Sequence, residues 1–390
     1  MKKNIITYFK HLFLTILALL VTGIVVGLSI GASVHYGDNP KAYMLENEGP
    51  YVFYVNDTSL SVNYVNGSRS VGYQLQKEVI ALNELKEATC YNYLDSTQFA
   101  VPIYTDYKTP ASVYNDDNKI VAISDIEGNY ITFRDMLISL QVMDDRLNWT
   151  FGTGHLVLVG DFVDRGAFVT QVLWLIYKLE KEAQDKGGQV HYIIGNHELK
   201  AMEGNTMSAS PKYFRVASVL DKNQVELYDH NSLIGKWLST KNSIEWINGH
   251  LFVHGGLHPD LMDHEVTLED MNKMIRESYY HTYYPTAHVD LKQLLTSTET
   301  GPCWYRGMLK GDIEQEQLDA LLNKFNARDI VMGHTLQGKI NRSYNEKVIG
   351  IDVKHPSDDH LNWPVGKSEA LLIDQDRYYR IVSNGSKEEL

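Results

Sequence analysis

The stretch His155–Gly166 reads HLVLVGDFVDRG, and it carries the clearest signal of the fold. Its apolar run, Leu156–Val159, ends directly at a glycine, which is typical of a buried strand in a parallel sheet. In open α/β sheets, ligands collect at the carboxyl ends of such strands. Two carboxylates, Asp161 and Asp164, follow this strand, with Arg165 beside them. Because unpaired carboxylates repel one another, the motif indicates a metal ion and a phosphate. For this motif alone, a capped turn with a surface ion pair is the alternative.

The same pattern recurs along the chain. From Asn118 onward, apolar strands alternate with loops and helices, which predicts a sheet flanked by helices. The predicted strands are Ile120–Ile123, Leu156–Val159, His191–Ile194, Leu251–Val253, Ile330–Met332, Val348–Asp352, Ala370–Ile373 and Tyr378–Val382, and the predicted helices are Tyr130–Leu140 and Ala167–Glu182. Five strands are followed by residue types that bind metals or phosphates: SDIEGN (124–129), GDFVDRG (160–166), GNHE (195–198), HGG (254–256) and GHT (333–335). One such motif is a weak signal, but five in order predict a metal site.

The N-terminus predicts a membrane segment. Lys2, Lys3 and Lys10 precede an apolar run that extends to Val34. We divide it into a cytoplasmic tail (1–10) and a transmembrane anchor or signal segment (11–34), since ~20 apolar residues are enough to cross a bilayer. Lysines before the span place the N-terminus in the cytoplasm and the rest of the chain outside it. If the segment is cleaved, the protein is instead secreted or periplasmic.

Residues 37–117 form a different region, which we predict to be a β-rich accessory region. Tyr51–Tyr54 and Ser61–Tyr64 indicate strands of hairpins, with turns at Asn56-Asp57 and Asn66-Gly67. Further along, Val79–Ala88 predicts a short helix and Ala100–Tyr104 another strand, whereas the polar tail Ser383–Leu390 is expected to fray. The catalytic domain is then 118–383.

Composition narrows the function. The net charge of −13 argues against a nucleic-acid partner, although a local metal cluster still permits phosphorylated substrates. Two cysteines, Cys90 and Cys303, lack the spacing of a zinc site. They form either one disulfide or two unrelated buried thiols.

The order and wording of the five motifs resemble the calcineurin-like metallophosphoesterases and, within them, the phosphoprotein phosphatase family. The segments LIGKWLSTKN (233–242), LFVHGGLHP (251–259) and GPCWYRG (301–307) are most similar to its bacterial Shewanella-like branch. The resemblance covers roughly 119–352. It implies a four-layer α/β/β/α sandwich, preceded here by the transmembrane helix and the small β-rich extension.

The resemblance also implies roles for individual residues. Two divalent metal ions would share Asp161, and a hydroxide bridging them would attack phosphorus in line. His197 would be the general acid oriented by Asp164, while Arg165 and Arg306 would bind the phosphate, a task suited to guanidinium groups. The metal ligands that it implies, with Asn196 also beside the substrate, are Asp125, Asp161, Asn196, His254 and His334.

One position departs from the family pattern. The first motif is normally Asp-x-His, but here it reads Asp125-Ile126-Glu127. In an extended segment Asp125 and Glu127 would point to the same side, so we expect Glu127 to replace the histidine as a ligand. Three oxygen ligands, Asp125, Glu127 and Asp161, favour Mn²⁺ or Mg²⁺ over zinc, and we expect Mn²⁺, with Fe, Zn or Mg as alternatives.

We therefore expect a membrane-anchored metallophosphoesterase that hydrolyses phosphomonoesters, with phosphoproteins as substrates. Two alternatives remain open at this stage. The enzyme could act on small molecules such as nucleotides or dinucleoside polyphosphates. Alternatively, Glu127 could mark a pseudophosphatase that binds phosphorylated partners without turnover.

Overall fold

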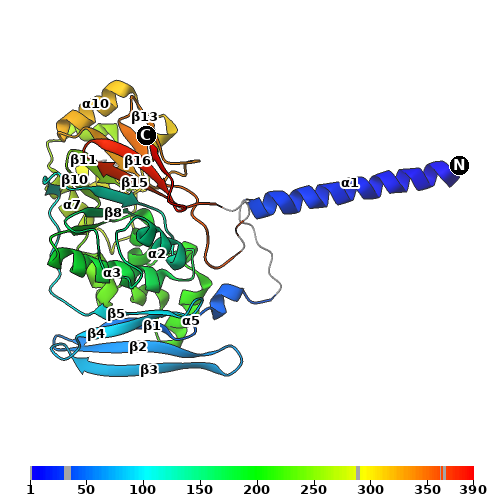
Figure 1. Ribbon diagram of the computed structural model, residues 1–390, viewed down its shortest axis with the longest axis horizontal. Helices are drawn as coiled ribbons and strands as arrows, with labels where there is room; N and C mark the ends of the chain where they lie inside the picture. Colours follow the sequence, from blue (N-terminus) through cyan, green and yellow to red (C-terminus); the bar gives the residue numbers. More distant parts are fainter. Residues whose placement is uncertain (1, 30–36, 287–289, 361, 363–365) are drawn as a thin grey trace.

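Two six-stranded sheets form the centre of the molecule in the computed structural model, which describes residues 2–29, 37–286, 290–360, 362 and 366–390 (Figure 1). The strands of the first sheet are, in spatial order, β17 (Lys387–Glu389), β16 (Arg377–Val382), β15 (Glu369–Asp374), β7 (Ile120–Ile123), β8 (His155–Val159) and β9 (Gln189–Ile193). Those of the second are β13 (Asn341–Ser343), β14 (Val348–Gly350), β12 (Asp329–Met332), β11 (His250–Val253), β10 (Ile244–Ile247) and β6 (Val113–Tyr114). All the strands predicted from the catalytic region are present.

The parallel strands of both sheets end at the same edge. In the first sheet β7, β8 and β9 run parallel, with Ile123 opposite Leu158 and Val159 opposite Ile193. In the second, β11, β12 and β14 run parallel. The loops that carry the five sequence motifs and the loop after β14 therefore start from neighbouring strand ends.

Alternating side chains divide the strands between two cores. Along β8, Val157 and Val159 pack between the two sheets, whereas Leu156 and Leu158 face the helices. Because both faces of each central strand are covered, nearly all of the strand residues are buried, as in other buried parallel sheets, and polar ones such as His191 and Glu245 are paired with each other. The order helix, sheet, sheet, helix confirms the expected sandwich.

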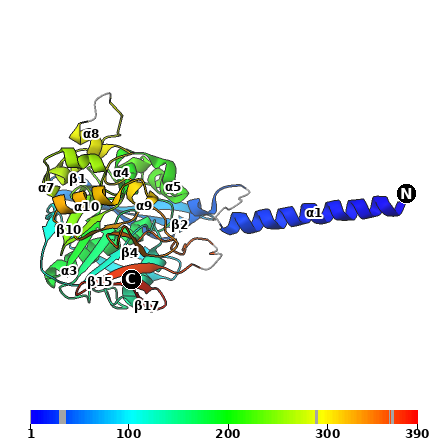
Figure 2. The ribbon, with the colours of Figure 1, turned by 90° about the horizontal axis from the view of Figure 1, so that it is seen from above.

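Helices cover the outer faces of the sheets (Figure 2). The described α-helices of this body are α2 (Tyr130–Ser139), α3 (Val169–Asp185), α4 (Asn196–Glu203), α5 (Pro211–Val219), α6 (Leu233–Leu238), α7 (Leu268–Arg276), α8 (Leu291–Thr296), α9 (Gly307–Lys310) and α10 (Gln315–Lys324). Of these, α3 packs on β9 and α7 on β10. The predicted helix 167–182 corresponds to α3.

The N-terminal region adds two small antiparallel sheets below the body in Figure 1. They are built from β1 (Glu48–Asn56), β2 (Ser59–Ser68) and β3 (Gly72–Ala81), and from β4 (Glu87–Asn92) and β5 (Thr97–Pro102). Strand β1 is held on α3, since the Trp174 indole donates to the Pro50 carbonyl at 2.8 Å. The buried ion pair of Lys212 with Glu48, at 2.7 Å, holds it on α5.

Three local predictions were wrong. Val79 and Ile80 continue strand β3, because pairing with β2 satisfies the backbone there, and no helix forms over 79–88. Asn66-Gly67 lies inside the β2–β3 pairing and is not a turn. The C-terminal residues do not fray: β17 pairs with β16, and Leu390 packs against the core between the sheets. In each case strand pairing outweighs local propensity. Both cysteines are free and buried.

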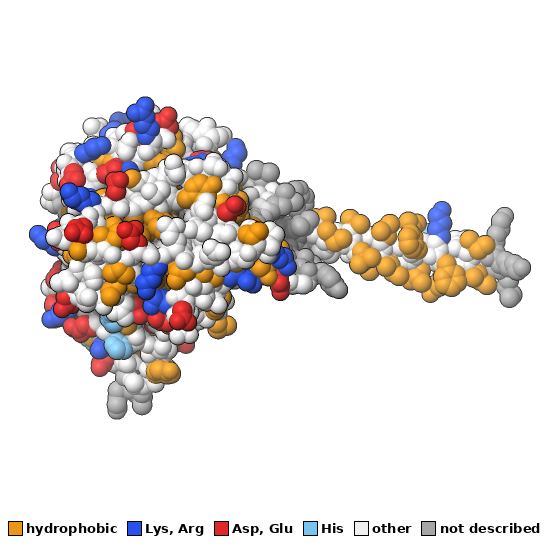
Figure 3. Space-filling model, turned by 90° about the horizontal axis from the view of Figure 1, so that it is seen from below, with side chains coloured by type: hydrophobic (Ala, Val, Ile, Leu, Met, Phe, Trp, Pro, Cys, Tyr) orange, Lys and Arg blue, Asp and Glu red, His pale blue; other side chains and the backbone are white. Residues whose placement is uncertain are grey.

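The N-terminal helix α1 (Lys2–Ser29) extends away from the body as an exposed rod (Figure 1). Residues Ile5–Gly27 have a mean hydropathy of 2.2 and are long and apolar enough to cross a membrane, although a signal sequence has the same properties. Hydrophobic side chains cover the rod (Figure 3). The last five residues of the predicted segment, 30–34, lie outside the described residues.

Candidate active site

Asp161 stands at the centre of the site, where the chain leaves β8. The backbone at Gly160 and Asp161 is left-handed, with φ of 78° and 60°. A Cβ atom at position 160 would lie 2.5 Å from His254 Nδ1, so only glycine leaves room for that ring. The turn directs the Asp161 carboxylate inward. Its Oδ2 lies 3.1 Å from His254 Nε2, and its Oδ1 accepts the backbone N–H of His197 at 2.9 Å.

Glu198 fixes this turn to the next motif. Its fully buried carboxylate accepts the backbone N–H groups of Asp161, Phe162 and Gly195 at 2.8 to 2.9 Å, and the Tyr192 hydroxyl at 2.9 Å. The loops after β8 and β9 are therefore joined by one side chain in the first turn of α4.

Around Asp161, a first group of ligand atoms comes from the loops after β9, β11 and β12. Asp161, His254 and His334 are all buried, and each places one ligand atom within 4.8 Å of the others. His254 Nδ1 lies 2.7 Å from the Val159 carbonyl, which fixes the ring with Nε2 facing the site. Such a backbone contact is typical of metal-binding histidines. The His334 ring is held in the same way by the backbone of Trp304.

The Asn196 amide completes this group and has two possible placements. With nitrogen inward, it donates to Asp161, His254 and His334, and its oxygen accepts from Lys200 at 3.1 Å. With oxygen inward, acceptor atoms of the other three residues lie within 2.8 to 3.2 Å of the amide oxygen. Carboxylate, amide and neutral imidazole are a donor set for a divalent transition metal, so the residues fit such an ion.

A second group also contains Asp161. It consists of Glu127, Asp161 and His197, whose ligand atoms again lie within 4.8 Å of one another. Asp125 is close by, and its Oδ2 accepts the His334 backbone N–H at 3.1 Å. The structure thus brings Asp125 and Glu127 into the site as expected, but not for the expected reason. Both have left-handed φ values, 54° and 49°, and the segment is not extended.

Two arginines lie at the open side of the site. Arg165 forms an ion pair with Glu127 and its side chain is 58% exposed. Arg306 donates to the His334 carbonyl, and its other terminal nitrogen is 3.3 Å from His334 Nδ1. Both guanidinium groups line the cleft into which the ligand groups open.

His197 lies between Asp164 and Arg165. Its Nδ1 is 2.8 Å from Asp164 Oδ2, and its Nε2 is 3.2 Å from an Arg165 nitrogen. A guanidinium can only donate, so Nε2 accepts and Nδ1–H donates to Asp164. The carboxylate thereby fixes the tautomer and the ring orientation.

The charges of the site perturb one another. Burial raises the pKa of the Glu127 carboxyl to about 7, even though Arg165 works against the rise. Burial lowers the pKa of His254, but Asp161 outweighs it and the pKa rises to about 10. Burial, with the neighbouring His254, lowers the pKa of His334 to about 2. Such opposed shifts within one cleft are characteristic of functional sites.

The cleft has a volume of about 720 Å³ and contains residues that the sequence analysis missed. Asp352 is buried beside Asp125, and His355, His360 and Lys41 line the wall. The rule used for the other motifs would have found Asp352, because it follows strand β14. No motif marks Lys41, which lies in the N-terminal region.

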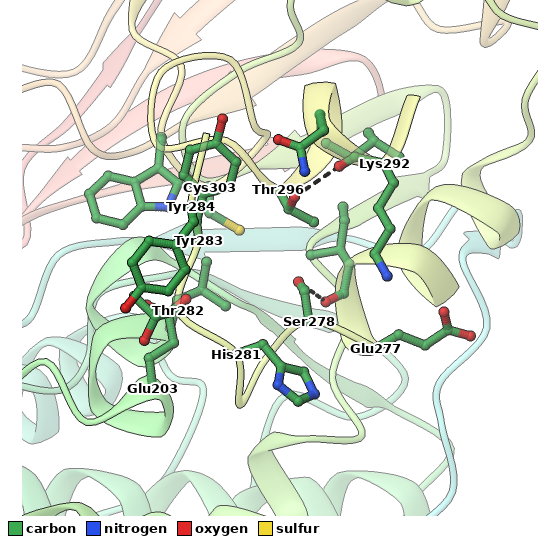
Figure 4. A pocket seen from close by; sticks show the side chains of 15 residues that line it. Glu203, Glu277, Ser278, His281, Thr282, Tyr283, Tyr284, Lys292, Thr296 and Cys303 are labelled. Atoms are coloured by element: carbon green, nitrogen blue, oxygen red, sulfur yellow. Dashed lines mark hydrogen bonds between the residues drawn. The ribbon is translucent and has the colours of Figure 1, made fainter. Parts of the chain in front are cut away.

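Figure 4 shows a second pocket, which has a volume of about 280 Å³. Tyr283, Tyr284 and Glu203 face one side of it, with Lys292 and Glu277 on the other. Trp304 lines this pocket, and its ring centre is 6.3 Å from that of His334. The aromatic run 279–284 therefore combines packing, through the buried Tyr279, with a pocket wall.

With this geometry established, comparison with known proteins identifies the family. The calcineurin-like phosphoesterase model matches residues 118–338, more than half of the chain. The chain belongs to this family. It is accordingly a metallophosphoesterase and a hydrolase, and the family depends on metal ions.

Relatives of this phosphoesterase carry Shewanella in their names. The crystal structure of the cold-active protein-tyrosine phosphatase of a psychrophilic Shewanella species has a TM-score of 0.75 and 30% identity, covering 88% of this chain and 99% of that one. Shewanella-like protein phosphatase 2 of Arabidopsis thaliana is 24% identical over 325 residues, which is 70% of this chain and 79% of that protein. Shewanella-like protein phosphatase 1 of Plasmodium berghei is 28% identical over 247 residues, 59% of this chain and 66% of the relative, just under two thirds of its length. These findings confirm the resemblance to the Shewanella-like branch.

Proposed function

We propose that this metallophosphoesterase hydrolyses phosphomonoesters on proteins, using two divalent ions that share Asp161. The observation that carries the proposal is that Asp161 belongs to both groups of ligand atoms. A carboxylate common to two groups suits a pair of ions ~3.5–4 Å apart. No covalent enzyme intermediate is needed for this chemistry.

In this proposal, Asn196, His254 and His334 hold one ion with Asp161, and Asp125 and Glu127 hold the other. When bound, the ions supply Lewis acidity and an activated water. Glu127 brings an oxygen ligand where the family pattern has a histidine, which supports Mn²⁺ as the preferred ion.

The chain's own residues then bind the phosphate and the leaving group. Arg165 and Arg306 bind phosphoryl oxygens through paired N–H groups. A phosphate that draws Arg165 toward itself also releases His197 Nε2, which Arg165 contacts at 3.2 Å. Nε2 can then carry the proton that the leaving oxygen requires, while Asp164 holds Nδ1.

The choice of phosphoproteins rests on relatives that are named protein phosphatases. The arrangement of His197 with Asp164 supports turnover over simple binding, because a binding protein has no use for a general acid. Small-molecule hydrolysis by the same site is the outcome that would redirect the proposal.

The N-terminal helix is proposed as a membrane anchor. Its apolar span and the lysines at its start support a cytoplasmic N-terminus with the catalytic domain outside the cytoplasm. We also propose 37–117 as an accessory region and 118–383 as the catalytic domain, since the family match begins at residue 118. The two regions pack together, because β6 of the first pairs with β10 of the second. Protease digestion of intact cells tests the orientation, and the mass of the mature chain tests cleavage.

The decisive experiment is an activity assay on the full chain in detergent. Nitrophenyl phosphate hydrolysis is measured with Mn²⁺, Mg²⁺, Zn²⁺ and Ca²⁺, and metal content is determined on the same samples. We expect turnover to be highest with Mn²⁺ at about two ions per chain. Phosphotyrosine and phosphoserine peptides are then compared with nucleotides, and faster hydrolysis of nucleotides would contradict the phosphoprotein assignment.

A further inference from the structure

A lysine from the N-terminal region reaches the phosphate-binding loop. Lys41 belongs to the short 3-10 helix η1 (Pro40–Tyr43), which lies outside the range matched by the family model. Its side chain is 26% exposed and lines the same cleft as Arg165 and Arg306.

The Lys41 ammonium contacts two partners there. Its Nζ donates to the Arg165 carbonyl at 3.3 Å and lies 3.0 Å from Asp359 Oδ2. The Asp359 side chain is 1% exposed, and its Oδ2 also accepts the Ala167 backbone N–H at 3.1 Å. One lysine and one buried carboxylate therefore hold the loop 165–167 on both sides of Gly166.

The two outer segments are themselves fixed. Tyr43 of η1 lies under the guanidinium groups of Arg69 and Arg215, at 4.1 and 4.3 Å from its ring centre. On the other side, Asp358 accepts the backbone N–H groups of Ile131 at 2.6 Å and Thr132 at 3.2 Å, at the start of α2. Lys41 and Asp359 therefore each lie close in the chain to a residue that is anchored by contacts with other segments.

These contacts matter for the placement of Arg165, because its own side chain is 58% exposed. Its backbone is left-handed, with φ of 55°, a conformation that costs free energy and persists only where surrounding contacts impose it. Its backbone N–H donates to the Ser208 carbonyl at 2.9 Å, and its carbonyl accepts from Lys41. Both polar groups of this peptide segment are thus used to direct the guanidinium toward the cleft.

We propose that Lys41 is a positioning residue of the phosphate site, holding Arg165 through its carbonyl and through the buried Asp359. The inference rests on the proposed function, in which Arg165 binds phosphate. It makes η1 part of the active site.

Calorimetric titration of inorganic phosphate into the Mn²⁺-loaded full chain tests this. Lys41→Ala should weaken phosphate binding by about tenfold, the loss expected for a charged hydrogen bond. Lys41→Arg should restore most of the affinity. Lys347→Ala is the matched control, because it removes a lysine–aspartate contact of 2.7 Å, to Asp319, away from the cleft, and should leave affinity unchanged.

Lys41→Ala leaves Asp359 as a buried carboxylate without the lysine that pairs with it. The titration is therefore repeated with the double variant Lys41→Ala/Asp359→Asn, which removes this charge as well. The double variant should show the same loss of phosphate affinity. In an Arg165→Ala background, Lys41→Ala should cause no further loss, since its effect passes through Arg165. An equal loss in both backgrounds, or unchanged affinity in Lys41→Ala, overturns the inference. A chain that binds phosphate with this dependence on Lys41 but hydrolyses no phosphomonoester overturns the proposed function alone.

Discussion

The two groups of candidate ligands around Asp161 differ in their burial and in the contacts that their side chains already make. In the group with Asn196, His254 and His334, every residue is buried, and the Val159 carbonyl holds the His254 ring. In the group with Glu127, the side chain of this residue is 20% exposed and forms an ion pair with Arg165, whose side chain is 58% exposed. The side chains of the first group converge on one another, whereas Glu127 of the second is paired with Arg165.

This difference separates two tasks. A buried set of fixed ligands binds an ion tightly, because the cost of ordering the ligands is met on folding. At Glu127, the existing contact is the ion pair with Arg165. A metal ion would compete with Arg165 for the Glu127 carboxylate, and a phosphate would compete with Glu127 for Arg165. We therefore expect metal choice, pH dependence and substrate entry to be decided at the Glu127 group.

The largest effect is expected where the groups meet. Asp161→Asn removes the carboxylate common to both, so both ions should be lost and kcat/KM should fall by a factor on the order of 1,000 or more. Activity and metal content are measured on the same samples. Unchanged metal content would contradict the shared position of Asp161.

The next largest effect is expected for His197→Ala, which tests proton transfer apart from metal binding. His197→Ala should slow hydrolysis of a phosphoserine peptide by ~10²–10⁴-fold, the usual contribution of a general acid. Nitrophenyl phosphate should be affected far less, since its leaving group needs no proton. Equal slowing of both substrates, together with loss of an ion, would instead make His197 a ligand of the Glu127 group.

A direct comparison of the groups uses His254→Ala and Glu127→His. We expect the first to remove the more tightly bound ion and to lower activity by about a hundredfold or more. The second restores the family's Asp-x-His pattern, and should keep two ions while moving the preference from Mn²⁺ toward zinc or iron. Metal competition measured with both variants checks this; an unchanged preference in Glu127→His would show that the residue does not select the ion.

The smallest effect is a pH dependence confined to the Glu127 group. With a pKa raised to about 7, its carboxyl is mostly protonated near pH 6, so affinity for the second Mn²⁺ should rise by up to about tenfold per pH unit until pH 7. The sign for stability is opposite: the folded-state pKa exceeds the ordinary value of 4.5, so stability of the metal-free protein falls as pH rises from 4.5 to 7. Titrations of Mn²⁺ at several pH values check the first statement, and thermal unfolding checks the second. Glu127→Gln should remove the first dependence and reduce the second, because the raised pKa values of Glu203, about 7, and Asp352, about 6, remain.

Much of the site could be predicted because its residues lie within a few positions of apolar strands. Asp161, Asn196, His254 and His334 follow β8, β9, β11 and β12, and parallel strands bring their carboxyl ends together. The same local signal predicted Glu127, although the backbone that places it is left-handed and not extended. A strand-end motif specifies position but not the φ values of a loop.

The family, the central sheets and most of the residues that gather around Asp161 could be predicted from the sequence alone, because short apolar runs and adjacent polar residues carry that information locally. Only the tertiary structure decided that Lys41, Arg165 and Asp359 meet at one cleft. Lys41 and Asp359 are more than 300 residues apart in the chain, and neither lies in a motif. Their contact depends on how η1 packs against α5 and how the loop after β14 caps α2, which is a property of the folded chain as a whole.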